Sequence, residues 1–242
     1  MDGSKAEIIE RLQKEILPLQ GFGSNPAPTL IPNLGVIDQA FANNRFAVGA
    51  IHEFISITPE DAAAAAGFIG GILSFLMQEE GTCLWIGMSR TVFPPALATF
   101  GIKPDNVIFV TLPTEKEVTW AIEEALKCRA VGAVVGELKH LDFTVSRRFQ
   151  LAVEQSGVTG FILRRGQLKM QTNACVTRWR ISSNAGIVPD ALPGVGHPSW
   201  YVELLKVRNG RPGAWKMAWI NNSFEHISEI VPAIRELKKK TG

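Results

Sequence analysis

Short apolar runs alternate with longer amphipathic segments through most of the chain. Apolar runs of strand length predict five strands, at residues 50–57, 82–88, 107–112, 130–138 and 159–163. Between them, apolar residues recur at helical spacing at residues 59–77, 114–128 and 144–156, and a proline-opened helix is predicted from Pro94 to Phe100. Strands that are apolar throughout and alternate with helices indicate an α/β fold, with a mainly parallel sheet flanked by helices.

The pattern changes after Arg164. Strands are predicted at residues 175–182, 200–208 and 215–220, and a turn-forming sequence, NGRPG, separates the last two at residues 209–213. Short strands joined by tight turns favour antiparallel pairing. We therefore expect an antiparallel extension at the C-terminal edge of the sheet.

The N-terminal segment is predicted to be a separate amphipathic helix at residues 4–17. Its apolar face consists of Ile8, Ile9, Leu12 and Ile16, and a linker rich in glycine and proline follows. This face must be buried, either on the same domain or on a neighbouring subunit or partner, and the sequence leaves both open. The predicted organisation is a helix and linker at 1–34, an α/β core at 35–222 and a basic tail at 223–242.

Composition adds little to this picture. The 242 residues carry a formal net charge of +2, and hydrophobic and charged residues make up 46% and 20% of the chain, as in ordinary soluble proteins. No apolar run of membrane length and no signal peptide is recognisable, so the expected location is the cytoplasm, with association with the nucleoid left open. The three cysteines and four histidines show no metal-site spacing.

The stretch at residues 49–77 has the order strand, loop, helix in which a P-loop occurs. A P-loop, G-x-x-x-x-G-K-S/T, binds phosphate through glycine N–H groups and a lysine, and Mg²⁺ through a hydroxyl. Here the loop and helix start contain no glycine or lysine, and no hydroxyl follows the loop. The positions concerned include Ser56, Thr58, Glu60, Asp61, Ala62 and Ala63.

The residues at this loop favour a self-sufficient helix start. Thr58 is a suitable N-cap, Pro59 suits the first helical position, and Asp61 follows the cap by three residues. Glu60 and Asp61 would place two carboxylates at the positive end of the helix dipole, where a phosphate would otherwise bind. We therefore expect no nucleotide cofactor and no catalytic residue, with unconventional nucleotide binding as the alternative.

Glu137 lies at the end of the fourth predicted strand, where ATPases hold Mg²⁺ through an acidic residue. As an exposed carboxylate it is either a vestigial or functional metal group of a divergent NTPase, or a structural residue. Without a phosphate-binding loop, one acid favours the structural role.

A basic segment is the main positive signal for binding. Residues 155–189 contain no Asp or Glu, and Trp179 stands between two arginines. Cations beside aromatic side chains are typical of surfaces that bind single-stranded nucleic acid, while an acidic protein partner or a plain surface with a buried Trp179 are the alternatives. The candidate contact residues are Arg147, Arg148, Arg164, Arg165, Lys169 and Arg178, together with Arg180.

Several segments, taken in order, resemble the ImuA family of RecA-like accessory proteins in bacterial damage-induced mutagenesis. They are CLWIG at 83–87, FGIKPDNV at 100–107, WAIEEAL at 120–126, AVGAVVGEL at 130–138, SRRFQLA at 146–152, VTGFIL at 158–163 and TRWR at 177–180. The resemblance covers roughly residues 35–220 and rests on the order of the segments. It implies a RecA-like core.

The resemblance also implies a function. Proteins of this family act without catalysis in SOS-induced translesion synthesis, together with an inactive Y-family polymerase homologue, an error-prone replicative polymerase, RecA or further copies of themselves. They lack a dependable P-loop, as does this chain. A SulA-like cell-division inhibitor is an alternative, because such proteins also resemble RecA without a P-loop. Direct contact with single-stranded DNA is compatible with the accessory role.

Overall fold

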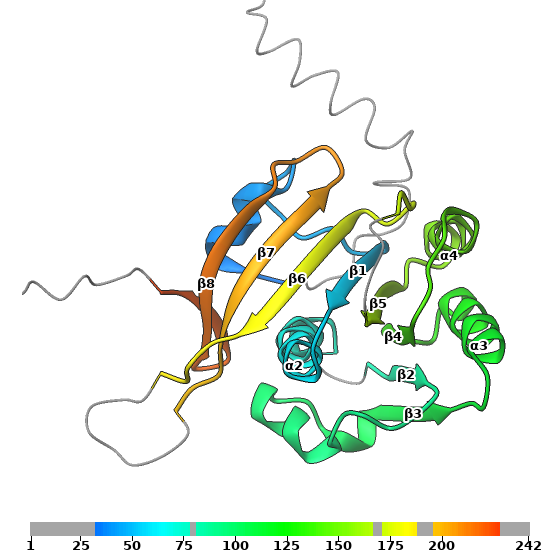
Figure 1. Ribbon diagram of the computed structural model, residues 1–242, viewed down its shortest axis with the longest axis horizontal. Coiled ribbons are helices and arrows are strands. Elements are labelled where there is room, and N and C mark those ends of the chain that lie inside the picture. Colours follow the sequence, from blue (N-terminus) through cyan, green and yellow to red (C-terminus); the bar gives the residue numbers. More distant parts are fainter. Residues whose placement is uncertain (1–31, 78–80, 167–170, 188–195, 228–242) are drawn as a thin grey trace, which may run out of the picture.

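A computed structural model describes residues 32–77, 81–166, 171–187 and 196–227 of the chain (Figure 1). A nine-stranded sheet forms its centre, with strand order β3-β2-β4-β5-β1-β6-β7-β8-β9. The first six strands in this order are parallel to one another, and β7, β8 and β9 are antiparallel to their neighbours. The predicted mainly parallel sheet with an antiparallel extension is confirmed. Strand β6, which the sequence placed in the extension, pairs in parallel with β1 on one side and antiparallel with β7 on the other.

The strand boundaries agree with the apolar runs. The parallel strands are β1 (Ile51–Ser56), β2 (Cys83–Gly87), β3 (Val107–Thr111), β4 (Ala133–Leu138), β5 (Thr159–Arg165) and β6 (Thr177–Ser183). The extension consists of β7 (Ser199–Val207), β8 (Gly213–Ile220) and β9 (Ser223–His226). All six residues of β1 and of β4 are buried, because helices cover the parallel part of the sheet on both faces.

Each described α-helix begins at a residue whose side chain caps it. Thr58 caps α2 (Pro59–Leu76), Thr114 and Glu117 form a capping box on α3 (Glu115–Lys127), and Asp142 caps α4 (Phe143–Ser156). The shorter helices η1 (Gly35–Ala40), η2 (Pro94–Phe100) and η3 (Pro104–Asn106) have 3-10 geometry. None of the described helices combines the length and apolar content needed to cross a bilayer.

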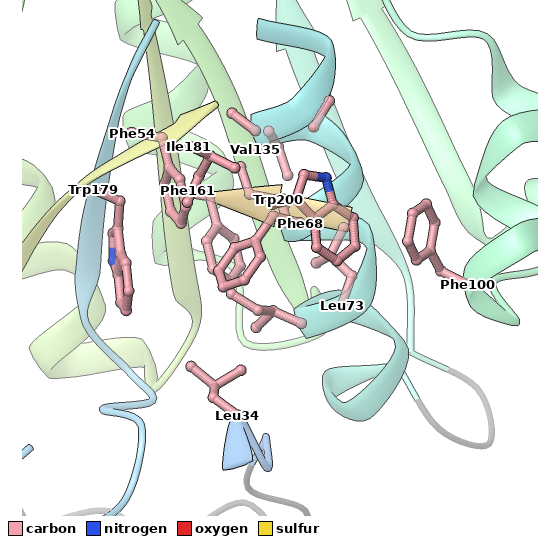
Figure 2. Packing of buried hydrophobic residues seen from close by; sticks show 14 of the residues in the cluster. Leu34, Phe54, Phe68, Leu73, Phe100, Val135, Phe161, Trp179, Ile181 and Trp200 are labelled. Atoms are coloured by element: carbon pink, nitrogen blue, oxygen red, sulfur yellow. The ribbon is translucent and has the colours of Figure 1, made fainter. Parts of the chain in front are cut away.

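Two hydrophobic clusters lie on opposite faces of the sheet. Helices α3 and α4 lie side by side and pack their apolar faces on one of them (Figure 1). The other, larger cluster contains α2 and most of the large aromatic side chains, including Phe54, Phe68, Trp179 and Trp200 (Figure 2). Glycines on α2 allow this close packing, since a Cβ at Gly71 would lie 2.5 Å from the Phe224 ring.

His52 is a packing residue of this aromatic cluster. Its ring stacks on Phe46 with the centroids 4.3 Å apart, and burial lowers its pKa to about 3, so it is neutral at physiological pH. Thr177 Oγ1 lies 2.8 Å from Nδ1, and the carbonyl of Ala47 lies 2.7 Å from Nε2. The Trp179 indole N–H donates to the same Thr177 hydroxyl, which joins β1 and β6 through a buried hydrogen-bonded chain.

The core extends past the predicted boundary at residue 222. Strand β9 pairs with β8, and Phe224 is buried against Phe68 and Trp219, with ring centroids 4.9 Å apart in each case. The sequence favoured a basic tail here because a four-residue strand at a sheet edge has too few apolar positions to show periodicity. The predicted N-terminal helix, with Ile8, Ile9, Leu12 and Ile16, and the tail from residue 228 lie outside the described residues.

Truncation of the buried ring in Phe224→Ala should reduce the free energy of unfolding by about 3–5 kcal/mol, because it leaves a cavity between α2 and the extension. Denaturant unfolding followed by circular dichroism measures this change. Phe143→Ala is the matched control, because this ring is 55% exposed and its loss should cost no more than about 0.5 kcal/mol. Equal effects of the two substitutions would place Phe224 outside the cooperative core.

Candidate functional site at the carboxyl ends of the parallel strands

The carboxyl ends of the parallel strands meet at one edge of the sheet, where ligands bind in open α/β folds. Helix α2 begins at this edge, immediately after β1. The Thr58 Oγ1 accepts a hydrogen bond of 3.1 Å from the Asp61 N–H, and Pro59 is the first helical residue. The predicted capped helix start is therefore confirmed.

The acidic side chains at this helix start remain exposed or half-buried. Hydrogen bonds from its own backbone N–H and from the Thr58 side chain lower the pKa of Glu60, which favours its charged form. Ala62 is buried, Ala63 is exposed and Ser56 is buried at the end of β1. A negative charge thus lies at the N-terminus of α2, where the helix dipole is positive.

Glu137 lies within β4 and is buried, which corrects the expectation of an exposed carboxylate. Its Oε1 accepts hydrogen bonds from Trp85 Nε1 at 2.8 Å and from Thr91 Oγ1 at 2.6 Å, and Arg165 Nη2 lies 3.3 Å from Oε2. The sequence suggested exposure because Glu137 ends an apolar run, but the loop after β2 and the side chain of Arg165 cover it. Through these contacts the Glu137 carboxylate on β4 connects β4 to β5 and to the loop after β2.

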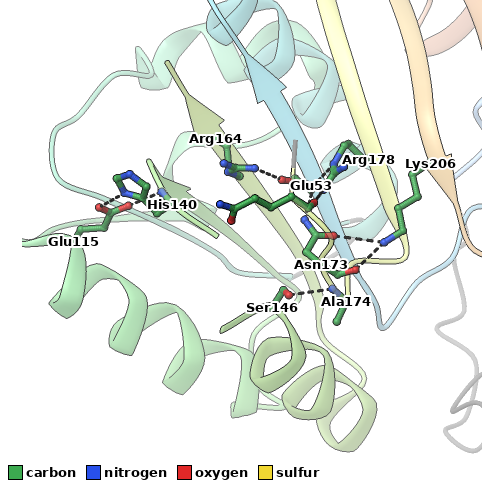
Figure 3. A network of polar contacts seen from close by, with 10 residues as sticks. Glu53, Glu115, His140, Ser146, Arg164, Asn173, Ala174, Arg178 and Lys206 are labelled. Carbon is green, nitrogen blue, oxygen red and sulfur yellow. Dashed lines mark hydrogen bonds and ion pairs between the residues drawn. The ribbon is translucent and has the colours of Figure 1, made fainter. Parts of the chain in front are cut away.

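A second buried carboxylate, Glu53 in β1, lies on the face of the sheet that α3 and α4 cover (Figure 3). Its Oε1 accepts a hydrogen bond of 2.7 Å from Arg164 Nη1. Its Oε2 accepts hydrogen bonds from Asn173 Nδ2 at 2.6 Å and from Arg178 Nε at 2.5 Å. Glu53 therefore joins β1 to β5, to β6 and to the segment before β6.

This network removes two of the predicted contact residues from the surface. Arg164 and Arg178 are 4% and 7% exposed, and Trp179, between Arg178 and Arg180, lies in the aromatic core. The basic segment was expected to be a surface because its acidic partner, Glu53, is more than 100 residues away in the sequence. A glutamate inside the apolar run at residues 50–57 was the signal that sequence reasoning missed, since a buried carboxylate requires a partner.

The remaining candidate residues are more accessible. Arg147 and Arg148 lie on α4 with about half of each side chain exposed. The Arg147 Nη1 lies 3.8 Å from the Glu154 Oε1, and the Arg148 guanidinium forms an ion pair with Glu123 on α3. Arg165 is partly exposed beside Glu137, and Lys169 lies outside the described residues. The structure therefore does not gather these arginines into one patch around residues 164–180.

Comparison with known proteins identifies the family. Protein ImuA of Caulobacter vibrioides, in two strains, is 33% identical over 203 residues, which cover 78% of this chain and 83% of that protein. The chain belongs to the ImuA family. No family model matches it.

The ImuA-family chain has a RecA-like fold. The RadB recombinase structure superimposes with a TM-score of 0.51 at 12% identity, covering 76% of this chain and 93% of that one. At this identity the similarity concerns the fold alone. Within that fold, the edge that would receive a ligand carries the acidic helix start and the covered Glu137 described above.

Glu53→Gln in this ImuA-family chain should reduce the free energy of unfolding by about 3–5 kcal/mol, because two buried guanidinium groups lose their counter-charge. Denaturant unfolding measures the loss, and Glu124→Gln on the exposed side of α3 is the matched control. Adding Arg178→Met to Glu53→Gln should restore part of the stability, since one unpaired cation is removed. A Glu53→Gln protein as stable as the control would contradict this account.

Proposed function

We propose that this chain is a non-catalytic, RecA-like accessory protein of SOS-induced translesion DNA synthesis that acts through protein–protein contacts. The observation that carries the proposal is the start of α2, where Thr58, Glu60 and Asp61 occupy the position of a phosphate-binding loop. A triphosphate brought to this point would meet carboxylates and no lysine. Membership of the ImuA family supports the cellular process, and the RecA-like fold supports a role as an assembly scaffold.

The state of Glu137 supports a role without nucleotide hydrolysis. An acid that positions Mg²⁺ through water needs access to solvent at the end of its strand. Here both carboxylate oxygens are engaged by Trp85, Thr91 and Arg165. The divergent-NTPase alternative requires this network to open before a metal ion could approach.

Exposed apolar side chains on α3 and α4 offer a contact surface for a protein partner. Trp120 on α3 is 63% exposed, and Phe143 and Leu151 on α4 are 55% and 42% exposed. Large aromatic residues are enriched among the side chains that dominate protein interfaces. The partners we propose are an inactive Y-family polymerase homologue, RecA and a second copy of this chain, with the predicted N-terminal helix as a further contact element.

The nucleotide alternative is tested by thermal unfolding with a non-hydrolysable ATP analogue and Mg²⁺. We expect no change in Tm at about 1 mM ligand, whereas a ligand bound with a Kd of about 10 μM would stabilise the fold by about 2.7 kcal/mol. Glu137→Gln serves as the matched variant. A stabilisation that the wild type shows and Glu137→Gln lacks would contradict the proposal and favour a divergent NTPase.

The interaction role is tested by measuring the affinity of the full chain for the purified polymerase homologue and for RecA. Trp120→Ala should weaken binding to at least one of them by about tenfold or more, because an interface anchor of this kind contributes about 2 kcal/mol. Phe93→Ala, another exposed aromatic (69%), is the control. Absence of binding to both proteins, and of self-association, would overturn the accessory role.

A further inference from the structure

The outer face of strands β6, β7 and β8 carries basic side chains and an exposed tyrosine. Arg180 pairs with Glu203, and Tyr201 pairs with Lys216, so all four side chains project from one face. This is the face of the sheet on which Arg178 reaches Glu53. Tyr201 is 41% exposed there, whereas its neighbours Trp200 and Val202 point into the aromatic core on the other face.

A β-bulge brings a further cation to this face. The register between β6 and β7 shifts after Arg178, which places Lys206 opposite Arg178 and leaves Leu205 as the extra residue. Lys206 Nζ then donates a hydrogen bond of 2.8 Å to the carbonyl of Asn173 (Figure 3). The amino group is thereby fixed at the border between β7 and the segment before β6.

Cations crowd together where this face meets α4. Arg208 Nη2 donates a hydrogen bond of 2.9 Å to the carbonyl of Ala174, and Arg147 on α4 is close enough to affect it electrostatically. Burial lowers the pKa of Lys206 and of Arg208, and both Glu154 and Arg147 are close enough to act on Arg208. Such crowding creates a positive potential that an anion would relieve.

The acidic groups of this face pair with some of its own cations or lie at its margin. Glu53 is shared by Arg164 and Arg178, and Glu203 lies 3.5 Å from Arg180. Glu154 lies 3.8 Å from Arg147 and also bonds to Gln150. Glu225, paired with Ala218, is on the edge strand β9. The cations therefore outnumber the carboxylates across the described part of this face and its border with α4.

We propose that this face binds single-stranded nucleic acid, with phosphates along the cations and a base on the Tyr201 ring. The cations are Arg147, Arg180, Lys206 and Arg208. Unpaired bases stack on exposed aromatic rings that lie on a basic sheet face. An acidic peptide without aromatic side chains would pair with the cations but would not stack on the Tyr201 ring. The site shares Arg147 and Arg180 with the sequence prediction but excludes Arg164 and Arg178, which are buried, and it is independent of the protein contacts proposed above.

The test is fluorescence anisotropy of a labelled oligothymidine of about 20 nucleotides with the full chain, at about 50–200 mM salt. Arg180→Gln combined with Lys206→Gln should weaken binding and reduce the slope of log affinity against log salt by about 1.4, because each phosphate that is no longer neutralised removes about 0.7 from the slope. Tyr201→Ala should weaken binding at least about fivefold with the slope unchanged, because a stacking interaction is uncharged.

Matched controls use side chains of the same kinds on other elements. Lys103→Gln with Lys116→Gln removes two exposed cations, and Trp120→Ala removes an exposed ring from α3; both should leave the affinity unchanged. Circular dichroism establishes that every variant is folded. If the double variant is unstable, Tyr201→Ala still tests the proposal, because the exposed Tyr201 ring can be removed without leaving a cavity in the core.

Three outcomes would overturn the proposal. They are no binding at the lowest salt concentration, equal losses in the test and control variants, and displacement of the oligonucleotide by polyglutamate with no effect of Tyr201→Ala. The last outcome would assign the face to an acidic protein. Trp120 and Tyr201 lie on different elements, so the two proposals can fail separately. A Tyr201→Ala protein that loses DNA binding but still binds its protein partners would support this inference without bearing on the accessory role.

Discussion

The carboxylate of Glu53 is the interaction on which the central part of the fold depends. It lies in the middle strand of the sheet with two guanidinium groups and an amide on its two oxygens, so it fixes β5, β6 and the segment before β6 relative to β1. Burying an ion pair is costly, and such a network is stable only when every oxygen is satisfied. The network therefore sets the geometry of the sheet at the point where its parallel and antiparallel parts join.

A consequence of this arrangement is that the basic segment at residues 164–180 is divided between the interior and the surface. Arg164 and Arg178 form ion pairs with Glu53, and Arg165 forms an ion pair with Glu137. The cations of the face proposed to bind nucleic acid come from separate elements, Arg147 from α4, Arg180 from β6, Lys206 from β7 and Arg208 from the residue directly after β7. The fold brings these cations together on one face of the sheet and at its border with α4, and the local sequence does not reveal it.

Polar groups are also satisfied within the chain at the edge of the sheet where nucleotides bind in related architectures. The α2 start is capped by Thr58 and carries its own carboxylates, and Glu137 is held by three side chains. These polar groups, which could otherwise face a phosphate or a metal ion, have partners within the chain or repel phosphate. The proposed role as a binding scaffold rests on this edge of the sheet, together with membership of the ImuA family and the RecA-like fold.

Local chemistry in the sequence determined the alternation of strands and helices, the caps at Thr58 and Thr114, and the absence of a phosphate-binding loop, because each depends on residues within a few positions of one another. Tertiary structure alone decided the burial of Arg164, Arg178 and Glu137. It also decided the inclusion of β9 in the core. Each of these depends on partners far away in the chain, such as Glu53, Trp85 and Phe68, which only folding brings within contact distance.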